Sequence, residues 1–269
     1  MKTSEQSSAI RLFQITDTHC FADDGTRLTW TDLPVYPNRS LRAVLDHLQS
    51  QAKGHAAIVL TGDLAQEETA ETYQRISELL SVFPLPCYAL PGNHDAPQLM
   101  NGNLGGTIQT LKNVQLGVWH LFLLDSHKPG QPYGQLTGAD IDFLKVRLSQ
   151  VSKTEFVALF VHHHPIDIES KWMDEMGLRE RDAFWKTLEP FPQVRAVFHG
   201  HAHQEFEGYH EYESGRKVMV YGTPATCIQV KPRTKALEFD HARPGWREIV
   251  LRPDGKVETQ VNYLTSVTS

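Results

Sequence analysis

The sequence predicts an α/β protein with more than one β-sheet. In the first half of the chain, short apolar runs that are typical of buried strands alternate with segments whose apolar residues recur at helical spacing. After His203, apolar runs follow one another with few helical segments between them, which indicates a second sheet packed on the first. The 269 residues contain no repeat and no linker-like stretch. We therefore expect one domain over residues 1–269.

The first half of the chain supplies the clearest strand and helix signals. A helix is expected over residues 40–52, because Leu41, Val44 and Leu48 recur at helical spacing and Ser40 is a suitable N-cap. A second helix is expected over residues 67–80. The strands of this half are alternating or continuous apolar runs, and they cover residues 10–15, 56–60 and 86–90.

The second half continues the pattern and adds two long irregular segments. Apolar runs predict strands over residues 119–124, 156–161, 196–198, 218–221 and 246–251, and helical spacing predicts helices over 139–151 and 179–188. Residues 21–38 and 166–178 lack such periodicity. Loops of this length in a compact domain are often lids or binding loops, so we expect these two to select the substrate.

Composition describes an ordinary globular protein, with 40% hydrophobic and 22% charged residues. The formal net charge of −6 argues against a nucleic-acid polymer as partner, whereas a small anion can still bind where metal cations reverse the local potential. No apolar run reaches membrane-spanning length, and residues 1–8 lack an apolar signal core. Three widely spaced cysteines favour a reducing compartment, so we expect a cytoplasmic protein without membrane partners.

Five short polar clusters carry the chemistry, and most of them follow a predicted strand. Residues at successive strand ends converge on one rim of a sheet. Oxygen and imidazole donors without thiolates are suited to two hard or borderline metal ions. The clusters are Asp17/His19, Gly62-Asp63, Asn93/His94, His162-His163-His164 and His201/His203.

Each cluster alone has an ordinary explanation, such as a turn or an N-cap, and 14 histidines will form some pairs by chance. The combination is much more specific. Asp63 is the candidate for a carboxylate that bridges two cations. Asn93 offers a carbonyl oxygen to a metal, and His94 can stabilise charge or protonate a leaving group, so both are candidate catalytic residues. His199 is expected to be a strand-end residue and not a ligand.

In this order, the clusters resemble the signature of the calcineurin-like metallophosphoesterase superfamily: Asp-x-His, Gly-Asp, Gly-Asn-His-(Asp/Glu), His and Gly-His-x-His. The longer stretches Thr61-Gly62-Asp63-Leu64-Ala65-Gln66, Leu90-Pro91-Gly92-Asn93-His94-Asp95 and Pro244-Gly245-Trp246-Arg247 are similar to bacterial class III 3′,5′-cyclic-nucleotide phosphodiesterases. The similarity extends over roughly residues 10–260. Cys20 departs from the pattern, since relatives usually have an aliphatic residue there, and we expect its thiol to be packed.

The resemblance implies a four-layer α-β-β-α sandwich of two facing mixed sheets and a site for two metal ions, with Fe or Mn expected and Zn or Co acceptable. One metal would be held by Asp17, His19, Asp63 and His203. The other would be held by Asp63, Asn93, His163 and His201, where His163 is chosen from the three adjacent histidines by resemblance to a His-x-Pro pattern. A water activated between the metals would then attack the phosphorus of the substrate in line with the leaving oxygen.

The implied substrate is 3′,5′-cyclic AMP, which would be hydrolysed to the 5′-monophosphate. Two alternatives stay open from the residues. The same site could act on another small diester, such as a glycerophosphodiester or a 2′,3′-cyclic nucleotide. A non-catalytic scaffold is also conceivable, but such domains typically have damaged ligand sets and this set is complete. A homodimer is compatible with the resemblance, although no segment requires it.

Overall fold

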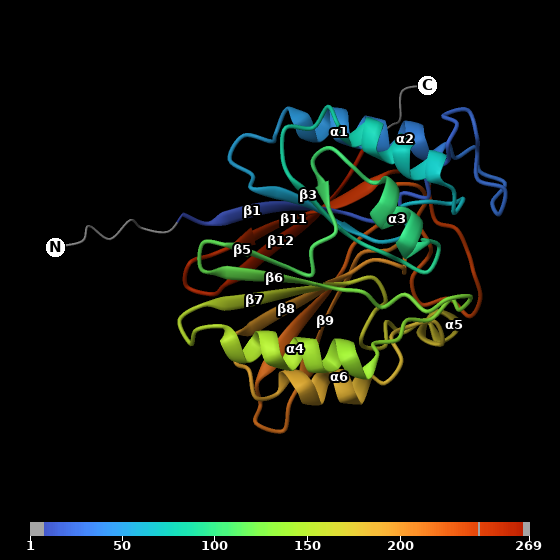
Figure 1. The fold of residues 1–269 in the computed structure, drawn as a ribbon. Coiled ribbons are helices and arrows are strands. Elements are labelled where there is room, and N and C mark those ends of the chain that lie inside the picture. The colour runs from blue at the N-terminus through green and yellow to red at the C-terminus, as the bar shows by residue number, and fades with distance from the viewer. Residues whose placement is uncertain (1–7, 242, 266–269) are drawn as a thin grey trace.

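The computed structural model describes residues 8–241 and 243–265, so the polar stretch 1–7 lies outside the described residues (Figure 1). Within this part, the strands form two six-stranded sheets. The first has the order β12-β11-β1-β2-β3-β4, namely Val257–Tyr263, Gly245–Leu251, Ile10–Ile15, Ala57–Thr61, Cys87–Leu90 and Ile108–Gln109. The second has the order β5-β6-β7-β8-β10-β9, namely Asn113–Leu116, Trp119–Leu124, Phe156–Val161, Val194–His199, Lys217–Gly222 and Phe206–Glu211. The helices are α1 Pro37–Gln49, α2 Ala70–Leu80, α3 Pro97–Asn103, α4 Gly138–Gln150, α5 Lys171–Asp174 and α6 Arg181–Leu188.

The sheets face each other and carry helices on their outer faces, as expected (Figure 1). Alternation along β1 shows how the sequence produces these layers, because successive side chains of a strand point to opposite faces. Leu12 joins the apolar core between the sheets, whereas Phe13 joins the core beneath α1 and α2. A third core lies between the second sheet and the helices α4 and α6. The predicted four-layer α-β-β-α sandwich is confirmed.

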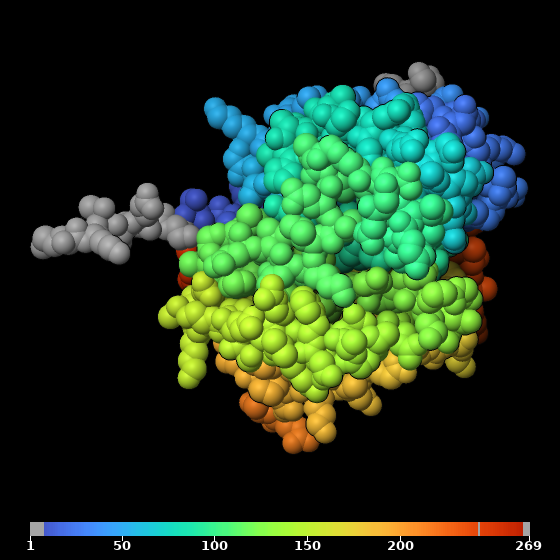
Figure 2. All heavy atoms as spheres, viewed as in Figure 1, coloured from blue at the N-terminus to red at the C-terminus, as the bar shows by residue number. Residues whose placement is uncertain are grey.

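Parallel pairing decides where the polar clusters lie. β1, β2 and β3 are parallel neighbours in the first sheet, and β7 and β8 are parallel neighbours in the second. Parallel strands end at the same edge of a sheet, so the loops that follow each group leave from one rim. In Figure 2 the first half of the chain, blue to green, lies against the second half, yellow to orange.

Two expectations about local structure were wrong. The strands after His203 do not make a sheet of their own: β9 and β10 extend the second sheet, while β11 and β12 return to the first. The first helix begins at Pro37, with Tyr36 as its N-cap, and Ser40 lies inside it. Proline suits the first helical turn because its fixed φ fits a helix and its missing N–H has no partner to lose. No helix in residues 8–241 and 243–265 has the length and apolar character of a membrane span.

Trp119 joins the two sheets at the end of the sandwich that is opposite the polar clusters. Its side chain is fully buried, and its Nε1–H donates to the carbonyl of Arg252, which follows β11, at 2.8 Å. Trp119 is the first residue of β6 and pairs with Phe156, the first residue of β7. The clusters that carry the chemistry follow the last residues of the strands.

We expect Trp119→Ala to lower the free energy of unfolding by about 3–5 kcal/mol, because it leaves a cavity in the core between the sheets. The measurement is urea denaturation of metal-free protein. Leu111→Ala is the control, since that side chain is 46% exposed. The folded fraction of Trp119→Ala should bind metal as well as the parent protein does. A change below about 1 kcal/mol, or loss of metal binding by folded protein, would contradict this account.

Candidate metal centre

The five polar clusters meet at the junction of the two sheets. Asp17, Asp63 and Asn93 come from loops that follow β1, β2 and β3, while His162 and His201 come from loops that follow β7 and β8. Main-chain hydrogen bonds tie the loops of the first sheet together: Asp17 N–H donates to the carbonyl of Gly62 and His19 N–H to that of Asp63, both at 3.0 Å. The strand-end convergence expected from the sequence is therefore present.

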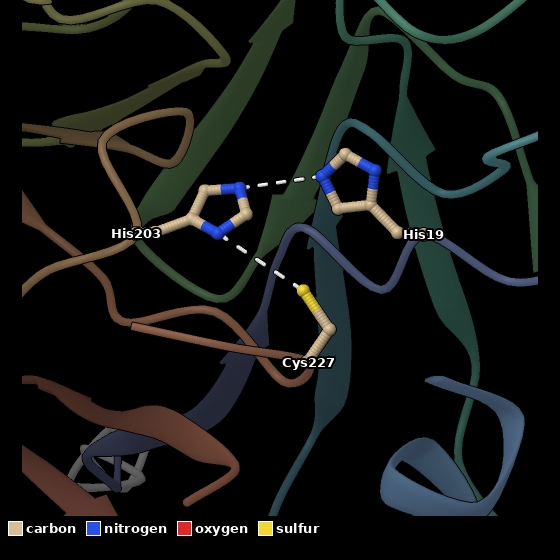
Figure 3. A group of neighbouring side chains, drawn as sticks. All are labelled: His19, His203 and Cys227. Carbon is tan, nitrogen blue, oxygen red and sulfur yellow. Dashed lines mark hydrogen bonds between the residues drawn. The ribbon is translucent and has the colours of Figure 1, made fainter. Parts of the chain in front are cut away.

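One group of side chains is built from Asp17, His19 and His203. His203 Nε2 lies 3.3 Å from Asp17 Oδ1. It also lies 3.2 Å from His19 Nε2, and Figure 3 shows these two imidazoles facing each other. The Asp17 carboxylate also accepts a hydrogen bond from the backbone N–H of His201, at 3.0 Å to Oδ2. A carboxylate from the first sheet is thus held by two residues of the second.

A second group surrounds Asp63. His162 Nε2 lies 3.3 Å from Asp63 Oδ2 and 3.2 Å from Asn93 Oδ1. The ring of His201 is 5.1 Å from that of His162, centroid to centroid. Asp63 Oδ2 is also 3.7 Å from His19 Nε2, so this carboxylate lies between the two groups. That is the position expected of a shared ligand.

The three adjacent histidines differ in direction. His162 follows β7 directly, and its ring faces Asp63 and Asn93. His163, the residue expected from the sequence to bind metal, directs its Nδ1 to the hydroxyl of Ser126 at 2.8 Å, while its ring lies 4.7 Å from that of His201. His164 Nε2 is 3.6 Å from Asp174 Oδ1. Of the three, His162 is thus the one whose Nε2 lies beside Asp63 and Asn93. His163 also belongs to a compact group of possible ligands with His162 and His201, so its choice as a ligand stays a prediction.

Outer partners fix three of these imidazoles with Nε2 directed inward. Nδ1 of His19 is 2.9 Å from Gln66 Oε1, that of His162 is 2.8 Å from the carbonyl of Thr61, and that of His203 is 2.9 Å from the carbonyl of Ile228. Each acceptor requires a proton on Nδ1, which leaves Nε2 available as a ligand. Gln66 ends the stretch Thr61-Gly62-Asp63-Leu64-Ala65-Gln66, and no local pattern in the sequence indicates that it orients His19.

Asp95, the last residue of Gly92-Asn93-His94-Asp95, fastens two loops of the site. Its fully buried carboxylate accepts backbone N–H groups of Gly92, Leu64 and Ala65 at 2.9–3.1 Å, and the hydroxyl of Tyr73 at 3.2 Å. Burial, together with the charge of Asp63, raises the pKa of Asp95 to about 6. Asp95, to which no role was assigned from the sequence, therefore connects the loops that follow β2 and β3 through hydrogen bonds.

The electrostatics of the site centre on two buried carboxylates. Burial is the strongest single influence on Asp17 and Asp63 and opposes their charged forms. The neighbouring histidines together outweigh it, with His203 foremost at Asp17 and His162 foremost at Asp63, so the pKa of each carboxyl lies below its usual value. Burial also opposes the charged forms of His162 and His203. Their partners, chiefly Asp63 for His162 and Asp17 for His203, together raise the pKa of His162 to about 9 and that of His203 well above its ordinary value. Two imidazolium charges thus compensate two carboxylates.

These residues fit a pair of metal ions. The imidazolium charges of His162 and His203 occupy places where cations would neutralise the carboxylates, and the facing nitrogens of His19 and His203 are suited to one cation between them. Burial holds the pKa of His201 well below its usual value, and its Nε2 has no hydrogen-bond partner among the described residues. Neutral imidazole, carboxylate and amide donors suit Fe, Mn, Zn or Co.

Close approach of the loops requires glycine at position 62. Gly62 has a φ of +92°, and a Cβ there would lie 2.5 Å from Nδ1 of His162 and 2.7 Å from the backbone nitrogen of Gly92. Backbone strain extends to ligand candidates, since Asp17, His19, Asp63, His201 and His203 all have φ values between +46° and +65°. Such conformations persist only where surrounding contacts hold them, and they cluster at functional sites.

A cavity of about 370 Å³ opens above the two groups. Its polar lining, which we call the floor, includes Asp63, Asn93, His94 and His203, and we call its apolar lining the walls. The backbone N–H of His94 donates to Asp63 Oδ1 at 2.8 Å, and its ring lies 5.0 Å from that of His19, so its position relative to the carboxylate is fixed. As expected, segments 21–38 and 166–178 contribute to the walls, through Trp30 and Trp172.

Two cysteines lie close to the site and both are buried. Cys20 belongs to the core beneath α1 and α2, and burial raises the pKa of its thiol to about 12, as expected of a packed residue. Cys227 Sγ lies 4.0 Å from Nδ1 of His203 (Figure 3). The carbonyl of Ile228 is much closer to the same nitrogen. Cys227 therefore packs against a ligand candidate without replacing its hydrogen bond.

We expect Gly62→Ala to destabilise metal-free protein more than Gly54→Ala does. Gly54 has a similar φ of +88° but no heavy atom within 4 Å of an added Cβ, so it is a matched control for backbone strain. The control should lose about 1–2 kcal/mol in urea denaturation, and Gly62→Ala about 1–3 kcal/mol more because of crowding. Metal binding should fall only for Gly62→Ala. Equal losses would show that the loops do not need this close approach.

Comparisons with known proteins agree with this geometry. The calcineurin-like phosphoesterase family matches residues 10–205. The chain is 36% identical over 261 residues to the 3′,5′-cyclic adenosine monophosphate phosphodiesterase CpdA of Vibrio vulnificus, covering 96% of this chain and 92% of the relative. It is 35% identical over 257 residues to the Escherichia coli protein of that name, covering 95% and 90%.

A solved structure of a dimetal phosphatase from Danio rerio has the same fold, with a TM-score of 0.62 at 13% identity, over 93% of this chain and 98% of that one. The order of the polar clusters, the layered sheets and the match over residues 10–205 lead to the same assignment. This chain belongs to the calcineurin-like phosphoesterase family, whose members bind two metal ions.

Proposed function

We propose that this protein hydrolyses 3′,5′-cyclic AMP to 5′-AMP as a metal-dependent phosphodiesterase. The observation that carries the proposal is a pair of acid and imidazole groups that share Asp63 beneath a cavity of about 370 Å³. Relatives of 31–36% identity over nearly the whole chain are named as phosphodiesterases of this substrate. The cavity has the size of a small-molecule site, which suits a mononucleotide better than a polymer.

The ligand set that we propose differs from the sequence-based one at a single residue. One metal would be held by Asp17, His19, Asp63 and His203. The other would be held by Asp63, Asn93, His162 and His201. His162 replaces His163 because its Nε2 is near Asp63 and Asn93, whereas Nδ1 of His163 bonds to Ser126.

When bound, the two metal ions supply Lewis-acid activation of the phosphate and of a water molecule. The chain's own residues then position the substrate. Asn93 offers its carbonyl oxygen to a metal and keeps its NH₂ group as a donor to the phosphate. His94 lines the cavity next to Asp63 and can protonate the departing 3′ oxygen.

We further propose Fe or Mn as the resident metals, with Zn or Co as acceptable substitutes, because oxygen and nitrogen donors accept all four and availability decides among them. The three cysteines are free and buried, which supports the cytoplasmic location expected from the sequence. That the protein forms a homodimer stays a prediction, which rests only on the resemblance to the family.

We expect His162→Ala to lose about one of two bound metal ions and His163→Ala to keep both, since only His162 directs Nε2 at Asp63. Metal content of gel-filtered protein, measured by inductively coupled plasma mass spectrometry after reloading with Mn, checks this. Circular dichroism of both variants controls for folding. If His163→Ala lost the metal and His162→Ala kept it, the sequence-based choice would be right.

We expect His94→Ala to reduce kcat for 3′,5′-cyclic AMP by roughly 10²–10⁴-fold, as for loss of a general acid, with both metals retained. His47→Ala is the control, because that histidine is exposed on α1. The assay compares 3′,5′-cyclic AMP with 2′,3′-cyclic AMP, glycerophosphodiesters and an aryl diester. Near-parental turnover by folded His94→Ala protein would remove the role assigned to it. Rapid aryl-diester cleavage without cyclic AMP turnover would overturn the substrate.

A further inference from the structure

The cavity above the metal centre has two chemically different parts. The floor consists of carboxylate, amide and imidazole groups, whereas the walls include Trp30, Trp172, Met176, Val230 and Leu237. The metal side of the floor would hold the phosphate of a substrate. An apolar wall offers little to a glycerol or sugar hydroxyl, which loses hydrogen bonds to water there. The wall instead suits a flat, weakly polar group attached to the phosphate-bearing part.

Trp172 is held in place by contacts between two loops. It belongs to α5, and its Nε1–H donates to the hydroxyl of Thr234 at 3.3 Å. The backbone N–H of Arg233 donates to the hydroxyl of Ser170 at 2.8 Å, and the Arg233 side chain forms an ion pair with Glu169. These contacts fasten segment 166–178 to the loop that carries Val230 and Leu237. The indole thus keeps its polar edge satisfied while its apolar body lines the cavity.

Trp30 has a different role in the wall. Its ring packs edge-on to His19 and His203 at centroid distances of 5.8 and 6.3 Å, and its Nε1–H donates to Gln66, which also contacts His19. A change at Trp30 would therefore disturb a metal-ligand candidate. Among the described residues, Trp172 has no hydrogen bond or ring contact with such a residue. Trp172 packs against the apolar group of Ile168, Met173 and Ala202. It is therefore the wall tryptophan whose replacement disturbs the metal centre less.

We propose that Trp172 is the surface on which the nucleobase of the substrate stacks, and that it determines the preference for cyclic nucleotides over diesters without a base. The inference rests on the proposed function and adds the identity of the group that occupies the apolar part of the cavity. Stacking on an aromatic ring tolerates different bases, because every base has a π-face. Trp172 therefore selects for the presence of a base more than for adenine itself.

The test compares metal-loaded, full-length parent and Trp172→Ala protein on two cyclic substrates and on glycerophosphocholine. The cyclic substrates are 3′,5′-cyclic AMP and the 3′,5′-cyclic phosphate of 1-deoxyribose, which has the same ring and phosphate but no base. Trp172→Ala should reduce kcat/KM for cyclic AMP roughly 5- to 150-fold, the range known for base–aromatic stacking, mostly through KM. It should leave kcat/KM for the abasic compound within about twofold.

Two further variants separate stacking from a structural effect. Trp172→Phe keeps an aromatic face and loses only the hydrogen bond to Thr234, so it should recover most of the cyclic AMP activity. Leu111→Ala, an exposed apolar truncation outside this cavity, should resemble the parent protein. Metal content should be equal in all four proteins. Calorimetric binding of 5′-AMP should weaken in Trp172→Ala, and that of ribose 5-phosphate should not.

The contrary results are distinguishable. Equal losses on both cyclic substrates, or an unchanged ratio between them, would overturn the stacking role and leave the proposed function standing. A loss confined to glycerophosphocholine would overturn it too and assign the wall to a trimethylammonium group, which aromatic faces also bind. No turnover of either cyclic substrate by metal-loaded parent protein would overturn the proposed function itself.

Discussion

Burial of two carboxylates at the junction of the sheets is the constraint on which the rest of the structure depends. Asp17 and Asp63 are 0% and 2% exposed, and their ion partners in the described part of the chain are histidines. A buried carboxylate costs several kcal/mol unless opposite charge and hydrogen bonds compensate it. In the metal-free protein, imidazolium groups supply that charge. Divalent cations supply more of it, so metal binding relieves a cost that the fold has already imposed.

Holding those carboxylates requires backbone that is unfavourable by itself. Several ligand candidates adopt positive φ, at a cost of order 1–3 kcal/mol each. Asp95 offsets part of this cost by accepting three backbone N–H groups from two loops, and Asp17 accepts the N–H of His201 across the sheets. The large apolar cores between the sheets and beneath the helices on their outer faces supply the remaining stability. The fold thus stabilises a site that is strained and highly charged, as is common where function requires both.

Sequence patterns predicted the strands that end at the site because those strands are buried on both faces. β1, β6 and β7 begin and end where their apolar runs do. The path of β11 and β12 back to the first sheet could not be predicted, because it depends on long-range pairing with β1 and not on local periodicity. The predicted start of α1 was wrong because Ser40 is a suitable N-cap by residue type, whereas the helix begins three residues earlier, at Pro37.

Prediction of the site was limited in a similar way. Types and order of residues identify the ligand candidates, but among three consecutive histidines the direction of each ring is decided by partners far along the chain. His163 Nδ1 lies at hydrogen-bond distance from the hydroxyl of Ser126, whereas His162 Nε2 lies beside Asp63 and Asn93. The role of Gln66 has the same origin, since it depends on a hydrogen bond to His19. The place of Trp172 at the cavity likewise depends on contacts between distant loops, such as the hydrogen bond from Arg233 to Ser170. Local sequence has no signal for such contacts.

The most direct test of a dinuclear centre shared by Asp63 is anomalous X-ray diffraction from crystals of the Mn-loaded protein, recorded above and below the manganese absorption edge. The account predicts two anomalous peaks per chain, on either side of the Asp63 carboxylate. One peak should be surrounded by Asp17, His19 and His203, and the other by Asn93, His162 and His201. A single peak, or two peaks of which only one contacts Asp63, would contradict it.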